Sequence, residues 1–152
     1  VIMGHTNGDI DSVGSSLGLY RFAKNFGKEA YIVNNTYGLT LKTFMEELTK
    51  FEEYQDVIID KSTAISKTNQ NTLSIVVDTH KKGYVEIPEL LELTDKIVIV
   101  DHHRKVEDFI ENVILSFHEA YASSSAELVT EIIENATNSI KLETIEAESL
   151  YA

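Results

Sequence analysis

Three short segments of the chain combine aspartate and histidine at spacings that suit metal binding. They are Gly4–Ser12 (GHTNGDIDS), Val76–His80 (VVDTH) and Ile99–Arg104 (IVDHHR). Carboxylates that lie close together repel one another unless a cation lies among them. The chain has no cysteine, so the donors are oxygen and nitrogen, which suit Mn²⁺, Mg²⁺ or Co²⁺ better than a structural zinc ion. With five or more candidate ligands, we expect two ions roughly 3.5–4 Å apart.

Two ions this close need a carboxylate that bridges them. Asp78 is the expected bridge, because it follows a central strand and can face both halves of the cluster. Asp9 and Asp11 are two residues apart, so in an extended loop their side chains would point the same way. Both precede a helix N-terminus, where negative charge is favoured. For any one segment alone, an aspartate that only caps the next helix is the simpler explanation.

The elements around these segments predict how they meet. The continuous apolar runs are typical of strands buried on both faces of a parallel sheet. We expect strands at Val1–His5, Ala30–Val33, Val57–Ile59, Leu73–Asp78, Lys96–Asp101 and Val113–Leu115. We expect helices at Asp11–Phe26, Leu41–Glu53, Ser125–Ala136 and Glu143–Tyr151. This alternation predicts an α/β fold with a mostly parallel β-sheet flanked by helices, with sites at the carboxyl ends of the strands.

Length and charge restrict the classes of function. The 152 residues predict one domain, 1–152. The net charge of −12 argues against binding long nucleic acid. No apolar run approaches the roughly 18 residues of a membrane span. The chain does not begin with methionine, so we expect it to be part of a longer protein.

The three segments resemble motifs I, II and III of the DHH phosphoesterase superfamily. The matching positions are His5-x3-Asp9-x-Asp11, Asp78 after an apolar strand, and Asp101-His102-His103. The superfamily includes RecJ-type exonucleases, nanoRNases, family II inorganic pyrophosphatases and cyclic di-AMP phosphodiesterases. The strings Val77–Lys81 (VDTHK) and Tyr121–Glu131 (YASSSAELVTE) are most similar to the last group, the GdpP-type enzymes. The resemblance covers essentially the whole chain and implies a three-layer, Rossmann-like DHH domain.

The resemblance also implies a role for each matching position. The metal ligands would be His5, Asp9, Asp11, Asp78 and His102. The first two would bind one ion, Asp11 and His102 the other, and Asp78 both. Asp101 would orient its neighbours. His103 would act on the substrate phosphate as proton donor or charge stabiliser, and Arg104 would contact a phosphate as a bidentate donor.

The implied activity is hydrolysis of cyclic di-AMP to pApA by a water molecule activated between two Mn²⁺ ions, with Mg²⁺ or Co²⁺ as alternatives. The partner would then be a cyclic dinucleotide, and a homodimer is allowed. The domain would be cytoplasmic, in a parent protein held at the bacterial cell membrane by an N-terminal region outside this chain. Two alternatives remain: a nanoRNase that cuts short linear RNA, and a non-catalytic domain that binds metal or nucleotide.

The sequence departs from the family pattern at its C-terminal end. The family has a fourth aspartate motif after a later helix, but no aspartate follows Asp108 in this chain. We expect that motif, and the DHHA1 subdomain with its Gly-Gly loop, to lie beyond Ala152. The chain would then be a truncated lobe that holds most of a metal site.

Several other polar residues are expected to have ordinary roles. Asp60 is interpreted as a loop or cap residue and His118 as a loop histidine without a nearby acidic partner. His80 is expected to pack or to lie at the substrate rim. Ser123–Ser125 are explained by helix capping almost as well as by a phosphate contact. Gly14 and Gly18 are expected to allow the first helix to pack closely on the sheet.

Overall fold

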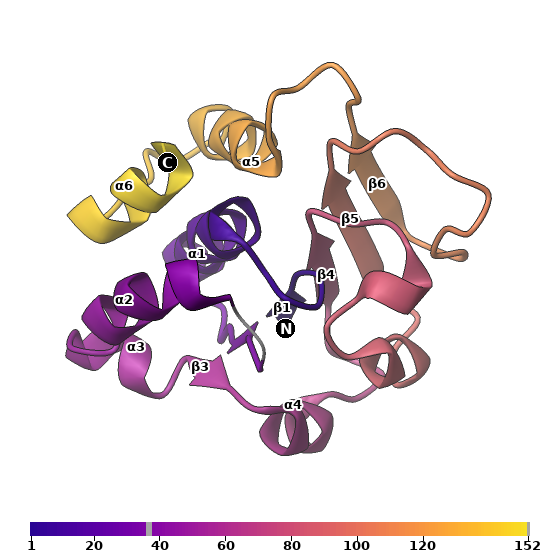
Figure 1. Ribbon diagram of the computed structural model, residues 1–152, viewed down its shortest axis with the longest axis horizontal. Helices are drawn as coiled ribbons and strands as arrows, with labels where there is room; N and C mark the ends of the chain where they lie inside the picture. Colours follow the sequence, from indigo (N-terminus) through magenta and orange to yellow (C-terminus); the bar gives the residue numbers. More distant parts are fainter. Residues whose placement is uncertain (36–37, 152) are drawn as a thin grey trace.

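Six short strands form one sheet, and every neighbouring pair is parallel (Figure 1). In this computed structural model, which describes residues 1–35 and 38–151, the strand order is β3-β2-β1-β4-β5-β6. The strands are β1 (Ile2–Met3), β2 (Ile32–Val33), β3 (Ile58–Ile59), β4 (Ser74–Val77), β5 (Ile97–Asp101) and β6 (Leu115–His118). The predicted parallel α/β sheet is therefore confirmed.

The chain adds strands first on one side of β1 and then on the other, so the strand order reverses once. The chain first extends the sheet from β1 through β2 to β3, then crosses back so that β4 pairs with the other side of β1. The chain after β1 then packs on one face of the sheet, with Val13 in one core cluster, and the chain after β4 packs on the other, with Leu90 in the second cluster. The two segments pair through an antiparallel bridge between His5 and Val85, and a crevice opens beside this bridge. In open α/β sheets, ligands bind at such a point, outside the carboxyl ends of the strands.

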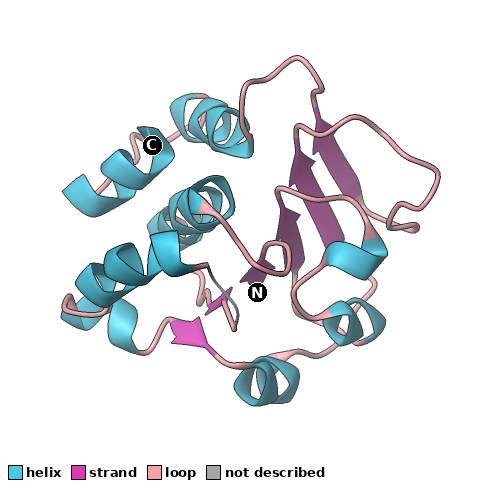
Figure 2. Ribbon diagram, viewed as in Figure 1, coloured by secondary structure: helices cyan, strands magenta, loops and turns pink. Residues whose placement is uncertain are grey.

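Helices cover both faces of the sheet (Figure 2). They are α1 (Ile10–Asn25), α2 (Leu39–Leu48), α3 (Glu52–Gln55), α4 (Lys61–Lys67), α5 (Ser125–Glu134) and α6 (Thr144–Tyr151), with short 3₁₀ turns η1 (Lys82–Tyr84) and η2 (Pro88–Glu92). The hydrophobic core is divided into two clusters, one on each face of the sheet. Two adjacent residues of β4 show this, because Val77 belongs to the cluster with α1 and α5, whereas Val76 belongs to the cluster with α4 and η2. None of the described helices is both long and apolar enough to cross a membrane.

Two predicted elements differ from the structure, and one helix of the structure was not predicted. The helix expected at Leu41–Glu53 is two helices, α2 and α3, separated by a turn in which the Thr49 hydroxyl donates to the Glu46 carbonyl. Helix α4 was not predicted, because its seven residues carry no apolar stripe. Strand β6 lies later than the predicted Val113–Leu115, since an exposed edge strand has no continuous apolar run to mark it.

Helix α1 packs closely against α5 and α6 through its two glycines. A Cβ atom on Gly14 would lie 2.2 Å from the backbone oxygen of Ser149, and one on Gly18 would lie 2.7 Å from a Val129 methyl group. The prediction that these glycines face the sheet was therefore wrong. They bring α6 and α5 close to α1, which carries Asp9 and Asp11 at its start.

A buried ion pair also holds α6 to α1. Glu146 is fully buried, and its two carboxylate oxygens share the single Nε–H of Arg21, at 3.0 and 2.9 Å. It also accepts a hydrogen bond from the Tyr54 hydroxyl at 2.7 Å. Breaking such a pair leaves an uncompensated buried charge. Because Tyr54 lies in α3, this network ties three helices together on one face of the sheet.

We predict that Gly14→Ala destabilises the protein. Alanine gains roughly 0.5–1 kcal/mol of helix propensity over glycine, but the new Cβ meets backbone atoms of α6, and such overpacking costs about 1–3 kcal/mol. Urea unfolding measures the difference in the free energy of unfolding. Gly83→Ala is the matched control, because its Cβ would meet open space. Equal stability of the two variants would contradict the packing described here.

Candidate metal centre

The three segments meet at one edge of the sheet. His5 follows β1, Asp78 follows β4 directly, and Asp101 is the last residue of β5. Because these strands are parallel neighbours in the order β1-β4-β5, their carboxyl ends lie side by side. The structure thus brings the predicted residues together at the crevice where the strand order reverses.

Asp78 lies at the centre of this cluster and is almost fully buried. One carboxylate oxygen lies 3.3 Å from His5 Nε2, and the other lies 3.6 Å from His102 Nε2 and 3.7 Å from His103 Nδ1. The backbone of Asp78 has a φ of +60°, a left-handed conformation that aspartate tolerates better than most residues. The sheet therefore presents one carboxylate to histidines from both other segments.

On one side of Asp78 lie His5 and Asp9. Asp9 caps α1 by accepting a hydrogen bond from the Ser12 backbone, and its carboxylate lies 3.8 Å from His5 Nε2. Hydrogen bonds to Asp78 and then to Asp9 raise the pKa of His5 to about 10. The same contact with His5 lowers the pKa of Asp9 to about 2. The opposite directions of these two pKa shifts mean that the His5 ring and the Asp9 carboxylate each favour the charged form of the other.

On the other side of Asp78 lie Asp11 and His102. The Asp11 carboxylate accepts hydrogen bonds from the backbone nitrogens of Ser125, at 2.9 Å, and Ala126, at 2.7 Å, at the start of α5. It also lies 3.7 Å from His102 Nε2. Burial, followed by the charge of Asp78, raises the pKa of Asp11 to about 6.

The expected geometry of Asp9 and Asp11 was wrong in one respect. They do not share an extended loop, because Asp9 is the N-cap of α1 and Asp11 already lies in its first helical turn. Asp9 therefore contacts His5, whereas Asp11 contacts His102 and the start of α5. This separation places one carboxylate on each side of Asp78.

Asp101 is completely buried beneath the cluster and makes several hydrogen bonds. One oxygen accepts from the His103 ring Nδ1 at 2.8 Å and from the His103 backbone at 3.2 Å, and the other contacts His80 Nδ1. Burial alone would raise the pKa of Asp101, but the hydrogen bonds from His80 and His103 outweigh burial and lower it. These contacts suit a residue that orients its neighbours rather than one that faces substrate.

A hollow of about 480 Å³ opens beside the cluster. Its lining includes Asp78, His103, Arg104, Lys81 and Tyr84. The His103 side chain is 53% exposed, whereas that of Asp78 is 2% exposed. An anion in this hollow would meet the cationic side chains of Arg104 and Lys81, which favour phosphate.

Two residues contribute more to this region than expected. His118 is not a loop histidine, because it ends β6, pairs in register with Asp101 and has its ring 5.0 Å from that of His80. Ser125 donates a hydrogen bond from its hydroxyl to Asp78 at 3.0 Å, while Ser124 is the residue that caps α5. The capping pattern marked this helix start, but nothing in it indicated which serine faces Asp78.

Two other expectations were confirmed. Asp60 caps α4 by accepting a hydrogen bond from the Thr63 backbone at 2.8 Å. His80 is buried and packed rather than exposed, as a packing role requires. Its contact with Asp101 had no local signal in the sequence, because it joins two different strands.

The donor set fits divalent cations. Two groups of three residues, His5-Asp9-Asp78 and Asp78-His102-His103, each place their ligand atoms within 4.8 Å of one another. Both groups contain Asp78, and their donors are imidazole nitrogens and carboxylate oxygens, which suit Mn²⁺, Mg²⁺ or Co²⁺. The residues present therefore fit two neighbouring ions that share one carboxylate.

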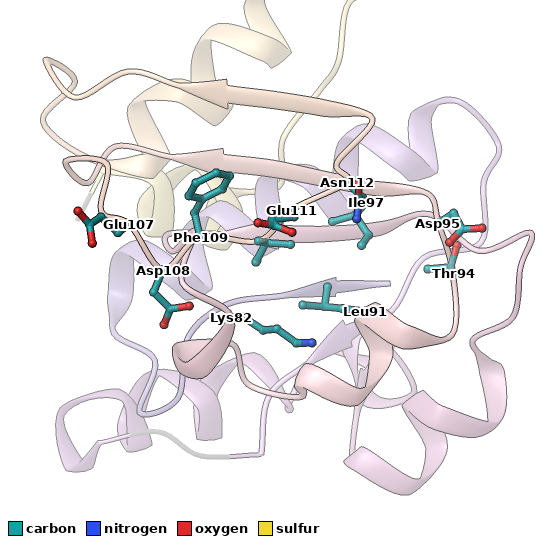
Figure 3. A pocket seen from close by; sticks show the side chains of 11 residues that line it. Lys82, Leu91, Thr94, Asp95, Ile97, Glu107, Asp108, Phe109, Glu111 and Asn112 are labelled. Atoms are coloured by element: carbon teal, nitrogen blue, oxygen red, sulfur yellow. The ribbon is translucent and has the colours of Figure 1, made fainter.

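A second hollow, of about 400 Å³, has a different lining (Figure 3). Figure 3 shows Lys82 and Phe109 among the side chains that line it, with Glu107 and Asp95 at its two ends. None of the eight predicted site residues lines this hollow among the described residues. Its carboxylates outnumber its single lysine, so it is a poor place for a phosphate.

Known proteins are similar to this chain in sequence and in fold. The family model "DHH family, N-terminal domain" matches residues 1–152. The chain is 38% identical over 154 residues to the cyclic-di-AMP phosphodiesterase GdpP of Bacillus subtilis, a match that covers 100% of the chain and 23% of that relative. The chain therefore spans less than a quarter of the length of that relative.

Two further similarities are more limited. Over 54 residues, the chain is 46% identical to the bifunctional oligoribonuclease and PAP phosphatase NrnA of Thermus thermophilus, which covers 36% of the chain and 15% of that relative. The solved structure of an exopolyphosphatase-related protein from Bacteroides fragilis superimposes with a TM-score of 0.69 at 21% identity, over 99% of this chain and 43% of that one. At this identity, the structural match supports the fold alone.

We predict that Asp78→Asn weakens Mn²⁺ binding more than any change outside the cluster, because one of its oxygens faces each group of donors. Calorimetric titration with Mn²⁺ should show at least a tenfold loss of affinity, about 1.4 kcal/mol. Asp95→Asn makes the same chemical change in the second hollow and should leave binding unchanged. Unaltered affinity in Asp78→Asn would mean that this carboxylate does not bind metal.

Proposed function

The chain belongs to the DHH family, and we propose that it is the metal-binding lobe of a phosphodiesterase that opens cyclic di-AMP to pApA. The observation that carries the proposal is the position of Asp78, within reach of both groups of metal donors. The identity of 38% to a cyclic-di-AMP phosphodiesterase, over the whole chain, supports this substrate. The relative is much longer, so the complete activity belongs to the whole protein.

Five residues would hold the metal ions. We propose that His5 and Asp9 bind one ion, that Asp11 and His102 bind the other, and that Asp78 binds both. Mn²⁺ is the proposed metal, with Mg²⁺ or Co²⁺ as alternatives. Such ions, when bound, lower the pKa of a water molecule and offset the charge of the phosphate.

The remaining residues act on the phosphodiester itself. The forming bond joins a water oxygen to phosphorus, and the breaking bond releases a ribose oxygen. The water gives up one proton to solvent as it attacks, and the ribose oxygen takes one up as it leaves. His103 is exposed in the hollow and held by Asp101, so we propose that it supplies this proton or stabilises the developing charge. Arg104 would bind the phosphoryl oxygens through its planar guanidinium.

We propose that this domain lies in the cytoplasm, as part of a bacterial protein anchored at the cell membrane through a region outside this chain. A homodimer is compatible with the proposal.

A second candidate is cleavage of short linear RNA. The similarity to an oligoribonuclease favours it, although that match covers 36% of the chain. Both functions would use the same ions and the same hollow. The two functions differ in whether cyclic di-AMP or short linear RNA is the preferred substrate. The third alternative, a non-catalytic domain that binds metal or nucleotide, would cut neither substrate.

We predict that the full-length protein with Mn²⁺ converts cyclic di-AMP to pApA and cuts pApA more slowly. Chromatography of the products over time measures both rates. Faster cleavage of pApA than of cyclic di-AMP would favour the nanoRNase function instead. No cleavage of either, with Mn²⁺ bound, would favour the non-catalytic alternative.

We predict that His103→Ala lowers kcat by about 10²–10⁴-fold, as expected for loss of a proton donor, while Mn²⁺ affinity stays within about twofold of wild type. Rate measurements and metal titration on the same sample separate the two effects. Arg104→Lys, which keeps the charge and loses the bidentate contact, should mainly raise KM. If Mn²⁺ affinity falls together with kcat in His103→Ala, this histidine is a metal ligand.

A further inference from the structure

His80 has no part in the proposed chemistry, yet it is buried beside the site with both ring nitrogens in contact. Nδ1 contacts the Asp101 carboxylate, and Nε2 lies 3.3 Å from the backbone nitrogen of Val106. A backbone N–H can only donate, so Nε2 of His80 accepts. In the neutral ring the proton therefore lies on Nδ1, which donates to Asp101.

This hydrogen bond leaves Asp101 with one histidine on each carboxylate oxygen. His80 occupies one oxygen, and His103 occupies the other through its ring Nδ1 at 2.8 Å and its backbone at 3.2 Å. Because Asp101 accepts from Nδ1–H of His103, Nε2 is the ring nitrogen left to face substrate. Nε2 is an acceptor in the neutral ring, and it donates the proton proposed above only when the ring is doubly protonated. The orientation of the Asp101 carboxylate thus fixes both the ring and the tautomer of His103.

The ring of His80 is itself held in place. The ring of His118 lies 5.0 Å away, tilted by 36°, and His118 in turn contacts the carbonyl of His103. The backbone oxygen of His80 also accepts a hydrogen bond from Ile110 at 2.8 Å. His80 therefore lies in a rigid setting between β4 and the segment after β5.

A third metal ion is the competing explanation, since ligand atoms of His80, Asp101 and His118 lie within 4.8 Å of one another. The hydrogen bonds described above already satisfy these groups. His80 has Asp101 and Val106 as partners, and His118 has the His103 carbonyl. The group holds together without a cation, so positioning explains it better.

We propose that His80 is a positioning residue that orients His103 through Asp101. This inference rests on the proposed function, in which His103 acts on the substrate phosphate. Loss of such an outer hydrogen bond typically costs about 10–100-fold in activity. The effect should appear in kcat, because the metal ligands and the phosphate-binding arginine are untouched.

Three variants of the full-length protein test the proposal. His80→Asn places an amide N–H near the position of Nδ1, His80→Gln places its amide near Nε2, and His80→Ala removes both. We expect His80→Ala and His80→Gln to lose about 10–100-fold in kcat, with KM and Mn²⁺ affinity within about twofold of wild type. His80→Asn should recover most of the rate. Equal losses in the Asn and Gln variants would overturn the proposal.

A double-mutant cycle with His103→Ala shows whether the effect passes through His103. In that background, His80→Ala should change kcat by less than about twofold. A further loss as large as in the wild-type background would mean that His80 acts by another route. If His80→Ala does not fold, the difference in kcat between His80→Asn and His80→Gln still tests whether the Nδ1 hydrogen bond matters.

A spectroscopic measurement separates this inference from the proposed function. Long-range ¹H–¹⁵N NMR of the histidine rings should show the Nδ1–H tautomer for His103 in the metal-free wild type and in His80→Asn. A mixture of tautomers is expected in His80→Gln. An unchanged His103 spectrum in all variants would overturn the positioning role, whichever substrate the protein cuts. Failure to cut cyclic di-AMP would instead overturn the proposed substrate and leave the NMR result intact.

Discussion

The structure of the site depends on one buried carboxylate. Asp78 follows the central strand β4, is almost fully buried, and has a left-handed backbone. A carboxylate in that position is costly unless donors or cations satisfy it. Its neighbours do so: His5 follows β1, His102 and His103 follow β5, and the hydroxyl of Ser125 comes from the start of α5. The residues that surround Asp78 are also those that suit a divalent cation.

The helices keep this arrangement in place from a distance. Asp9 and Asp11 lie on opposite sides of Asp78 only because α1 begins between them. The N-terminus of α5 donates two backbone hydrogen bonds to Asp11, so the helix dipole favours this negative charge as well. Gly14, Gly18 and the Arg21–Glu146 pair set the distance between α1 and its neighbours. Packing far from the crevice therefore determines where the carboxylates lie.

Much of this could be predicted from the sequence, and the reasons for the failures are physical. The runs that end in Asp78 and Asp101 marked buried parallel strands, and parallel strands must place their ends at one edge. Local patterns did not indicate partners that are distant in sequence. The contact of Asp11 with α5, the pairing of His118 with Asp101, and the packing of Gly14 on α6 all join segments far apart in the chain. A short helix such as α4 carries too little apolar pattern to be recognised. The edge strand β6 was expected, but its exposed residues did not mark its bounds.

The central claim is that two cations share the Asp78 carboxylate. Diffraction from Mn²⁺-soaked crystals, with data collected at the manganese absorption edge, tests it most directly. The account predicts two anomalous peaks on either side of Asp78, one beside His5 and Asp9 and the other beside Asp11 and His102. A single peak, or peaks that do not contact Asp78, would contradict it.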